Sequence, residues 1–205
     1  MSGIIEFFFD FSSPYGYFAI DKIESLARKQ GREAVWRPIM LGAAFKKTGN
    51  VPLAEQPIKG DYCKHDWERM AAYMGLPWTL PDPFPIPTLA AARAFYWLNE
   101  RDKDLAKKFA RAAYHQYFGE GKDITSVDAV AEIAAGLNID PAELTSAVAN
   151  SEIKARLKQE TTDAIDRGVF GSPFFIVDGE GFWGSDRMWM IKKHLQQDRW
   201  SGAHE

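Results

Sequence analysis

The sequence predicts an α/β fold in which a β-α-β half and a β-β-α half are separated by a long helical block. Three observations support this prediction. Each end of the chain carries a short apolar run of strand length next to a segment with helical spacing. The middle of the chain contains a series of helix-start signals. The order strand, helix, strand at the amino end implies a parallel pair of strands joined by a crossover helix.

The amino-terminal half begins with a buried strand. Residues 4–11 form an apolar, aromatic-rich run that is interrupted by two acidic residues. Ser13 follows as a natural helix N-cap, and Pro14 occupies the first helical position, where its missing N–H costs nothing. We expect this helix to span residues 14–29 and a second strand to span residues 33–39.

The middle of the chain is predicted to be irregular at first and then helical. Residues 41–61 contain two turn clusters and are expected to form a loop. A helix is predicted over 62–74, and the proline-rich stretch 77–87 excludes both helix and central strand. Further helices are predicted over 88–101, 104–118, 125–135, from residue 140 onward, and over 151–167.

The carboxyl-terminal part returns to strand character. A turn over 168–173 leads into a short apolar strand over 174–177. The Asp-Gly-Glu-Gly sequence at 178–181 predicts a hairpin turn, after which residues 182–183 pair back. A last helix is expected to begin at residues 184–186.

Length and composition limit the classes of protein to consider. The chain has 205 residues, of which 46% are hydrophobic and 26% charged, so it can bury a core without disulfide or metal staples. The net charge of −3 gives no sign of a nucleic-acid partner. No apolar run approaches the ~18 residues of a membrane span, and the amino end lacks the basic segment of a secretion signal. We expect a cytoplasmic protein without a membrane partner.

Cysteine and histidine usage argues against redox and metal chemistry. Cys63 is the only cysteine, so the chain cannot form an intrachain disulfide, a thiolate zinc cluster or a CxxC redox pair. Because Cys63 lies within a predicted helix, a buried structural role is expected. No metal site is predicted, since no metal-ligand spacing relates the four histidines, His65, His115, His194 and His204.

Three segments resemble a known group of enzymes. The sequences FDFSSPYGYFA at 9–19, GNVP and KGDY within 49–62, and GVFGSPFFIVDGEGFWGSDRMWMI at 168–191 are similar to those of 2-hydroxychromene-2-carboxylate isomerases and kappa-class glutathione transferases. This group belongs to the DsbA-like branch of the thioredoxin superfamily. The resemblance implies glutathione as the cofactor, a small aromatic or electrophilic substrate and a homodimer.

The resemblance also implies a division of the chain. Residues 1–41 and 168–205 are expected to form a discontinuous thioredoxin-like domain, and residues 42–167 an inserted helical domain, together in one compact unit. In the DsbA-like branch the motif C-P-x-C opens the first helix. Here the aligned residues, 13–16, read Ser-Pro-Tyr-Gly. Both cysteine positions are lost, so dithiol oxidoreductase chemistry is excluded.

Ser13 matches the catalytic serine of the family. A hydroxyl at a helix N-cap can donate to an anion in front of the helix, where the helix dipole and backbone N–H groups also favour negative charge. A thiol held at this position has a lowered pKa, because its thiolate form is stabilised there. Since the chain has no cysteine at this position, the thiolate would arrive with glutathione. The alternative is that Ser13 only caps its helix, and both roles can coexist.

Further glutathione contacts are implied by the same match. Ser172 and Pro173 match the step at which the family has a cis-proline, which turns the backbone of Ser172 toward an extended peptide ligand. Ser185 and Asp186 match the residues that hold the γ-glutamyl end. Asn50 matches a family asparagine that orients the thiol or a substrate oxygen. Each match has a structural alternative: a strand-entry turn at Ser172 and Pro173, a helix cap at Ser185 and Asp186, and a Gly-Asn turn at Asn50.

Several other side chains are candidates for contact with the substrate. Lys46, Lys47 and Lys59 would offset carboxylate charge on the ligand, with Lys59 preferred, or else are solvated surface lysines. Trp183 either lines the site or fills the core. The isomerases hold their aromatic acid with Tyr, Asn and paired Arg residues in a loop that corresponds to residues 80–87. Here that loop contains no arginine and no tyrosine, which favours a more apolar acceptor site.

These observations lead to three hypotheses about function. The first is a glutathione-dependent isomerase of aromatic catabolism, which converts hemiketal acids of the 2-hydroxychromene-2-carboxylate type into trans-o-hydroxybenzylidenepyruvates. A Ser13-stabilised thiolate would add to the conjugated carbon, the ring would open, the bond would rotate, and the thiolate would leave. The second is a kappa-like transferase that conjugates apolar electrophiles. The third is a redox-dead, thioredoxin-like binding module.

Overall fold

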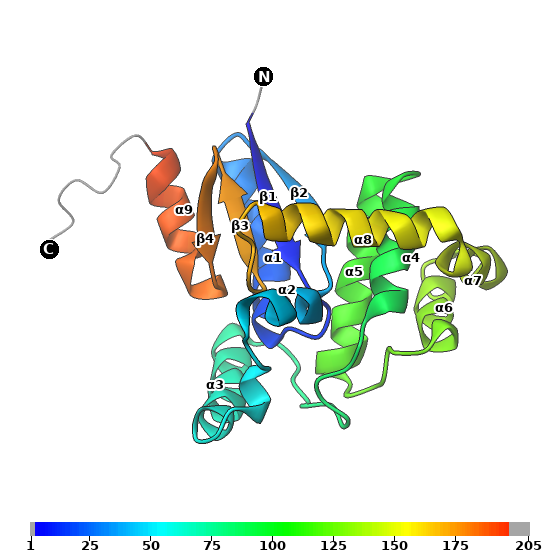
Figure 1. Cartoon of the computed structure of the whole chain (residues 1–205), viewed down its shortest axis with the longest axis horizontal. Helices are drawn as coiled ribbons and strands as arrows, with labels where there is room; N and C mark the ends of the chain where they lie inside the picture. Colours follow the sequence, from blue (N-terminus) through cyan, green and yellow to red (C-terminus); the bar gives the residue numbers. More distant parts are fainter. Residues whose placement is uncertain (1–2, 197–205) are drawn as a thin grey trace, which may run out of the picture.

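The computed structural model describes residues 3–196, and its centre is a four-stranded sheet flanked by helices (Figure 1). Parallel pairing joins the first two strands, and antiparallel pairing joins the third strand to the first and the fourth to the third. The spatial order is β2-β1-β3-β4, with the strands β1 (Ile4–Phe9), β2 (Glu33–Pro38), β3 (Phe174–Val177) and β4 (Glu180–Trp183). The predicted α/β fold with a helical insertion is confirmed.

Both faces of β1 are buried, which explains why its sequence is continuously apolar rather than alternating. Phe7 and Phe9 point to one face, where the Phe7 ring stacks on Phe9 at 4.8 Å and on Phe175 at 5.4 Å between ring centroids. Phe8 points to the other face and packs in a smaller cluster with Phe174. Because side chains alternate along a strand, one short segment supplies the core of both layers.

Helices cover the two faces of the sheet. The helix α1 (Pro14–Lys29) and the helix α9 (Met188–Leu195) lie on the face to which Phe7 points. The helix α8 (Ser151–Asp166) lies across the opposite face (Figure 1). The predicted cap of α1 is confirmed, since the Ser13 hydroxyl accepts a hydrogen bond from Gly16 N at 3.1 Å.

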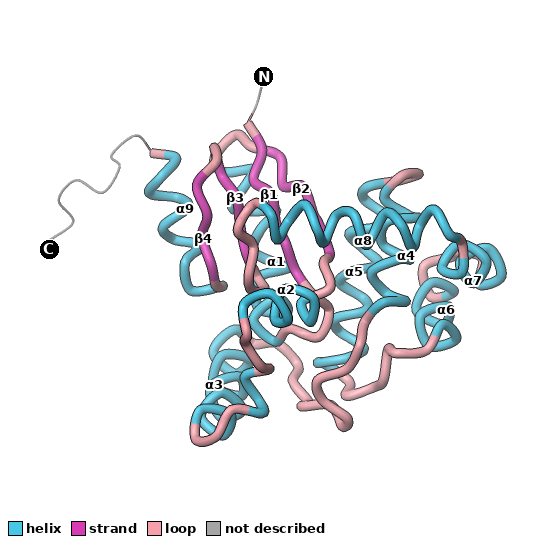
Figure 2. The backbone as a smooth tube through the Cα atoms, viewed as in Figure 1, coloured by secondary structure: helices cyan, strands magenta, loops and turns pink. Residues whose placement is uncertain are grey.

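The remaining helices lie beside and below the sheet in Figure 2. Aromatic rings connect this group of helices to α1, since Tyr17 of α1 stacks on Tyr114 at 6.1 Å and Phe18 of α1 lies 5.6 Å from Trp78 between ring centroids. These helices are α3 (Lys59–Met74), α4 (Leu89–Asn99), α5 (Lys103–Tyr114) with a following π turn (His115–Gly119), α6 (Val127–Ala135) and α7 (Pro141–Ala149).

The loop predicted over 41–61 is wrong. This stretch contains the helix α2 (Leu41–Thr48) and a 3-10 turn (Leu53–Glu55), and α3 begins at Lys59 instead of residue 62. No side chain of its own segment caps the start of α2. The Leu41 N–H donates instead to the carboxylate of Asp10 at 2.8 Å. A helix that is capped from a distant segment gives no start signal in its local sequence.

Smaller corrections concern the ends of elements. The chain turns through a 3-10 segment, Ser185–Arg187, before α9 begins at Met188. The N-cap of α6 is Ser126, one residue after the predicted start. The hairpin turn is the two-residue Asp178-Gly179, and both residues have the positive φ that a type I′ turn requires, so β4 starts at Glu180. In residues 3–196 no helix is both long and apolar enough to cross a membrane.

Candidate functional site

The sheet edge at the carboxyl end of β1 brings together segments that are far apart in the sequence. Phe8 pairs with Phe174, so the turn that leaves β1 lies beside the turn that enters β3. Trp183 also pairs with Phe174, which places the end of β4 at the same edge. There the Gly184 N–H donates to the Pro173 carbonyl at 3.0 Å. The turn after β1, the Ser172-Pro173 turn and the end of β4 therefore meet at one edge.

Ser13 is buried at this edge and has two hydrogen-bond partners. Its hydroxyl donates to the Ser172 carbonyl at 2.8 Å and accepts from Gly16 N at 3.1 Å. A serine hydroxyl has one proton to donate. That proton is directed at Ser172, while the oxygen caps α1. Ser13 is thus both the cap of its helix and a link to the turn before β3, so capping alone does not describe it.

The peptide bond between Ser172 and Pro173 is cis, as the family resemblance implied. Both residues are buried. The Ser172 hydroxyl accepts from the backbone N–H of Asp10 at 2.9 Å. The Ser172 carbonyl, which was expected to pair with a peptide ligand, accepts instead from Ser13.

The segment Ser185–Arg187 contacts α1 and so lies near the same edge. The Asp186 carboxylate is exposed and forms an ion pair with Arg187. Gly184 has a φ of +105°, and a Cβ there would lie 2.4 Å from an oxygen of Asp186. The positive φ is what favours glycine at this position, and the Asp186 carboxylate lies over the space beside it.

Asn50 and the three candidate lysines are not buried with Ser13. Asn50 follows the end of α2 and is exposed, as are Lys46 and Lys47 in the last turn of that helix. Lys59 is exposed at the first residue of α3. These four side chains are free to meet a ligand from the solvent side.

Trp183 lies beside the cis-proline turn instead of in the core. Its side chain is half exposed, and its ring lies 5.0 Å from that of Phe170. A Cβ on Gly171 would lie 2.2 Å from the indole nitrogen, so the indole covers the backbone just before Ser172. Trp183 and Phe170 thus form an aromatic wall next to the turn.

Cys63 has the structural environment expected of it. The residue is buried on the inner side of α3. Burial raises the pKa of its thiol, and the nearby positive charge of Lys59 only partly opposes this. The thiol form is inert as a nucleophile. Within residues 3–196, no group of three or more His, Cys, Asp or Glu side chains is arranged to hold a metal ion. His204 lies outside the described residues.

Sequence reasoning missed Asp10, which it treated only as an acidic interruption of a strand. Asp10 is buried at the end of β1. Its carboxylate accepts hydrogen bonds from Ser12, Leu41 and Thr88. The available signal was a carboxylate placed inside an apolar run, directly before the Ser-Ser-Pro sequence. A buried carboxylate has to be satisfied by hydrogen bonds, so such a position predicts a polar network.

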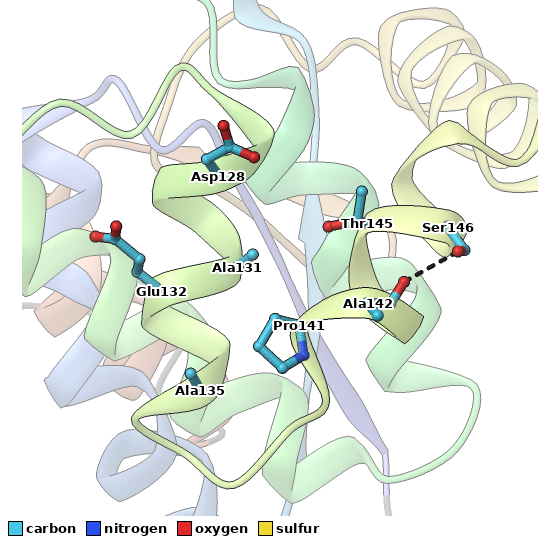
Figure 3. Close-up of a pocket in the computed structure, with 8 residues that line it drawn as sticks. All are labelled: Asp128, Ala131, Glu132, Ala135, Pro141, Ala142, Thr145 and Ser146. Atoms are coloured by element: carbon cyan, nitrogen blue, oxygen red, sulfur yellow. Dashed lines mark hydrogen bonds between the residues drawn. The ribbon is translucent and has the colours of Figure 1, made fainter.

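A surface hollow lies elsewhere, between α6 and α7 (Figure 3). Its helices contact α4 and α5. The hydroxyl of Ser146 in this hollow donates to the Ala142 carbonyl at 2.9 Å, within its own helix (Figure 3). The remaining lining is mostly small and apolar, with two acidic side chains, and no hydrogen bond joins its hydroxyl groups to these carboxylates. This hollow is a less suitable reaction site than the edge around Ser13. Its lining residues are Asp128, Ala131, Glu132, Ala135, Pro141, Ala142, Thr145 and Ser146.

The comparison with protein families agrees with this geometry. A family model described as the DSBA-like thioredoxin domain matches residues 4–196. The chain is a member of the DsbA-like thioredoxin family. Its only cysteine is Cys63, so it cannot form the pair of cysteines that a CxxC redox motif requires.

Relatives of this DsbA-like protein include an isomerase and a transferase. It is 32% identical over 197 residues to 2-hydroxychromene-2-carboxylate isomerase from Sphingobium xenophagum, covering 95% of this chain and 99% of the relative. It is 30% identical over 207 residues to glutathione S-transferase kappa 2 from Caenorhabditis elegans, covering 95% and 92%. A solved structure of 2-hydroxychromene-2-carboxylate isomerase superposes with a TM-score of 0.84 at 26% identity, over 95% of both chains. The predicted resemblance is confirmed, and the chain groups with enzymes.

Proposed function

We propose that this protein is a glutathione-dependent isomerase of hemiketal acids of the 2-hydroxychromene-2-carboxylate type. The observation that carries the proposal is the position of the Ser13 hydroxyl. It caps α1 and lies 2.8 Å from the carbonyl of Ser172 before the cis-proline. By the family resemblance, Ser13 takes the place of the first cysteine of the redox motif. A hydroxyl donor at a helix N-terminus suits a thiolate that a ligand brings.

The residues at the edge fit glutathione through an exchange of hydrogen bonds. In the structure, Ser13 donates its proton to the Ser172 carbonyl. When a thiolate lies in front of α1, Ser13 turns this proton to the sulfur. The freed Ser172 carbonyl then accepts a backbone N–H from the ligand, as the edge of an added strand would provide. The ligand N–H replaces Ser13 as the donor to the Ser172 carbonyl, so this buried carbonyl is not left unsatisfied.

The outer parts of the ligand would meet the exposed side chains around this edge. Asp186 would release Arg187 and accept from the ammonium group of the γ-glutamyl end, and Ser185 would contact its carboxylate. Asn50, Lys47 and Lys59 would approach from the solvent side, where the lysines offset carboxylate charge. Trp183 would provide an apolar wall for the substrate.

The chemistry needs no oxidant or reductant. When bound, glutathione supplies a thiolate that adds to the conjugated carbon, allows the bond to rotate once the ring has opened, and leaves unchanged. The role of this chain is to hold the thiolate form at neutral pH through Ser13 and the start of α1. Ser13 keeps its proton throughout, so it acts as a hydrogen-bond donor instead of a base.

A kappa-like transferase activity is the second candidate, and the loop at residues 80–87 favours it. This loop has no arginine or tyrosine to clamp an aromatic acid. Phe84 packs there against Trp67, with 5.5 Å between ring centroids, and against Phe118 at 6.1 Å. An apolar acceptor region suits electrophiles without a carboxylate. Such a substrate would keep the sulfur and leave as a conjugate.

A calorimetric titration with glutathione tests the proposal, using the wild type, Ser13→Ala and Ser126→Ala. Ser126 is a matched control because it also caps a helix through its hydroxyl, with Ala129 N at 3.0 Å, but it lies in α6. We expect binding by the wild type and the control, and about tenfold weaker binding by Ser13→Ala. Absence of glutathione binding by the wild type would contradict both enzyme functions.

Turnover then separates the two enzymes. An isomerase converts the hemiketal acid while the concentration of free glutathione stays constant, whereas a transferase consumes one glutathione for each product. The family resemblance also makes the protein a cytoplasmic homodimer in this proposal, and light scattering after size-exclusion chromatography measures the mass of the assembly in solution.

A further inference from the structure

One buried carboxylate, that of Asp10, lies at the centre of the polar contacts behind Ser13. Its Oδ1 accepts from Ser12 N at 2.8 Å, from the Ser12 hydroxyl at 2.8 Å and from the Thr88 hydroxyl at 2.9 Å. Its Oδ2 accepts from Leu41 N at 2.8 Å. All four donors are neutral. Four donors that converge on two oxygens are the arrangement that an ionised carboxylate, which only accepts, satisfies.

The backbone of Asp10 is bonded to the proposed thiolate site as well. Its N–H donates to the Ser172 hydroxyl at 2.9 Å, and its carbonyl accepts from Ser13 N at 2.9 Å. The same carbonyl accepts from the Tyr114 hydroxyl at 2.7 Å. Asp10 is therefore bonded directly to both residues whose hydrogen bond defines the site.

The carboxylate also joins the starts of three helices. Ser12 and Ser13 lead into α1, Leu41 is the first residue of α2, and Thr88 is the residue before α4. A negative charge is favourable at the amino end of a helix. The helix α2 depends on the carboxylate most directly, because the N–H of its first residue, Leu41, bonds to it and no side chain of its own segment caps it. This helix leads to Asn50.

We infer that Asp10 is a positioning residue that fixes Ser13, the turn at Ser172 and the start of α2 in one arrangement. The inference rests on the proposed function only in the experiments that measure bound glutathione. Asp10 does not touch the thiolate in this account. It acts through Ser13 and Ser172, and it sets where α2 presents Asn50.

If Asp10 acts through its charge, Asp10→Asn should change the amount of bound thiolate in one direction, and if it acts by positioning other residues, in the opposite direction. This difference makes the inference testable. Removing a negative charge near the site favours a thiolate by Coulomb's law, so a role through charge alone predicts more thiolate. A positioning role predicts less. The amide offers one oxygen and one NH₂ group, so in either orientation an N–H faces donors that the carboxylate satisfied, either Leu41 N or the three groups at Oδ1.

The experiment measures the ultraviolet absorbance of thiolate at saturating glutathione and neutral pH. We expect Asp10→Asn to lower this absorbance severalfold and to weaken glutathione binding about tenfold. Ser126→Ala serves as a control for lost stability, and its absorbance should equal that of the wild type. An unchanged or raised absorbance in Asp10→Asn would overturn the inference. Should Asp10→Asn not fold, Ser12→Ala keeps the charge and removes one donor, and an unchanged absorbance there would overturn it equally.

Amide hydrogen exchange judges the inference without any ligand. We expect the Leu41 or Ser12 amide, together with that of Ser13, to lose protection in Asp10→Asn and to keep it in Ser126→Ala. If the wild type binds no glutathione, the proposed function fails, and this exchange pattern alone decides on Asp10. Protection that is unchanged in Asp10→Asn would show that the carboxylate does not hold these segments.

Discussion

The sheet edge around Ser13 and the helical insertion are built in different ways. At the edge, polar groups join segments that are far apart: Ser13 bonds to Ser172 across 159 positions of sequence. In the part of the insertion that contains α6 and α7, the helix caps are local, since Asp140 caps α7 through Ala142 N at 2.8 Å and Ser126 caps α6 through Ala129 N at 3.0 Å. The candidate chemistry thus lies where the geometry depends on distant contacts, whereas α6 and α7 start from signals in their own local sequence.

The substitution with the largest expected effect tests whether the stability of the fold can fall while glutathione binding is unchanged. Leu144 is fully buried on α7. We expect Leu144→Ala to lower the free energy of unfolding by about 2–5 kcal/mol, because it leaves a cavity in the insertion. Glutathione affinity should stay at the wild-type value. Denaturant unfolding and calorimetry of the same variant check both statements. A parallel loss of affinity would show that the two regions are not independent.

The next effect concerns a second long-range polar contact, at Glu6 on β1. Burial alone would raise the pKa of Glu6, but the hydrogen bonds and charges of Arg167 and Arg37 outweigh it and hold the pKa below its ordinary value of 4.5. A carboxyl with a lowered pKa in the folded state stabilises the protein above its unfolded pKa. This contribution is lost as the pH falls below about 4.5, through the folded pKa.

Glu6→Gln should remove that pH dependence. We expect it to lower the free energy of unfolding at neutral pH by about 1.5–3 kcal/mol, the range for hydrogen bonds to charged groups. In acid, the variant should lose less stability than the wild type as the pH falls. Urea unfolding at a series of pH values measures the two slopes. Equal slopes would mean that the contacts of Glu6 with Arg167 and Arg37 contribute nothing to stability.

A smaller effect compares the same substitution in the two regions. Ser13→Ala and Ser126→Ala each remove the capping hydroxyl of a helix, so each should cost about 1 kcal/mol of unfolding free energy. Ser13→Ala should cost somewhat more because it also removes the donor to Ser172. Thermal unfolding of both variants gives the difference. A larger loss for Ser126→Ala would contradict the account of the edge.

The smallest effect is a gain in stability. Gly42 lies in α2, and a Cβ there would have open space around it. Gly42→Ala should therefore raise the free energy of unfolding by about 0.5 kcal/mol. In contrast, a Cβ on Gly16 would lie 2.3 Å from the hydroxyl of the buried Tyr114, so Gly16→Ala should destabilise the protein. Denaturant unfolding of the two variants compares their free energies of unfolding and so distinguishes the effect of helix propensity from that of packing.

The sequence was sufficient for elements that carry their own signals. The sequence predicts helix starts at Ser13-Pro14 and at Asp140-Pro141, and both caps form in the structure. It also predicts the apolar strands near the two ends of the chain, and these pair in the sheet. The helix α2 was not predicted, because its cap comes from Asp10, 31 positions earlier. Local propensity contains no information about such a partner.

The residues of the candidate site also differ in how far the sequence could predict their surroundings. The structure brings Ser13 and Ser172, two residues that the resemblance assigned to glutathione, into direct contact with each other, and it places the Ser185–Arg187 turn against α1. Asn50 and Lys59 remain on the surface, where the sequence alone gave no means to place them. Asp10 was missed because its partners become its neighbours only when the chain is folded, with Thr88 78 positions away.

The most direct test of the account is a crystal structure of this protein with glutathione bound. We predict that the sulfur lies within hydrogen-bond distance of the Ser13 hydroxyl, in front of α1, and that a backbone N–H of glutathione donates to the Ser172 carbonyl. The Ser13 hydroxyl would then no longer donate to Ser172. Glutathione bound at another surface, or bound at this edge with its sulfur away from Ser13, would contradict the central claim.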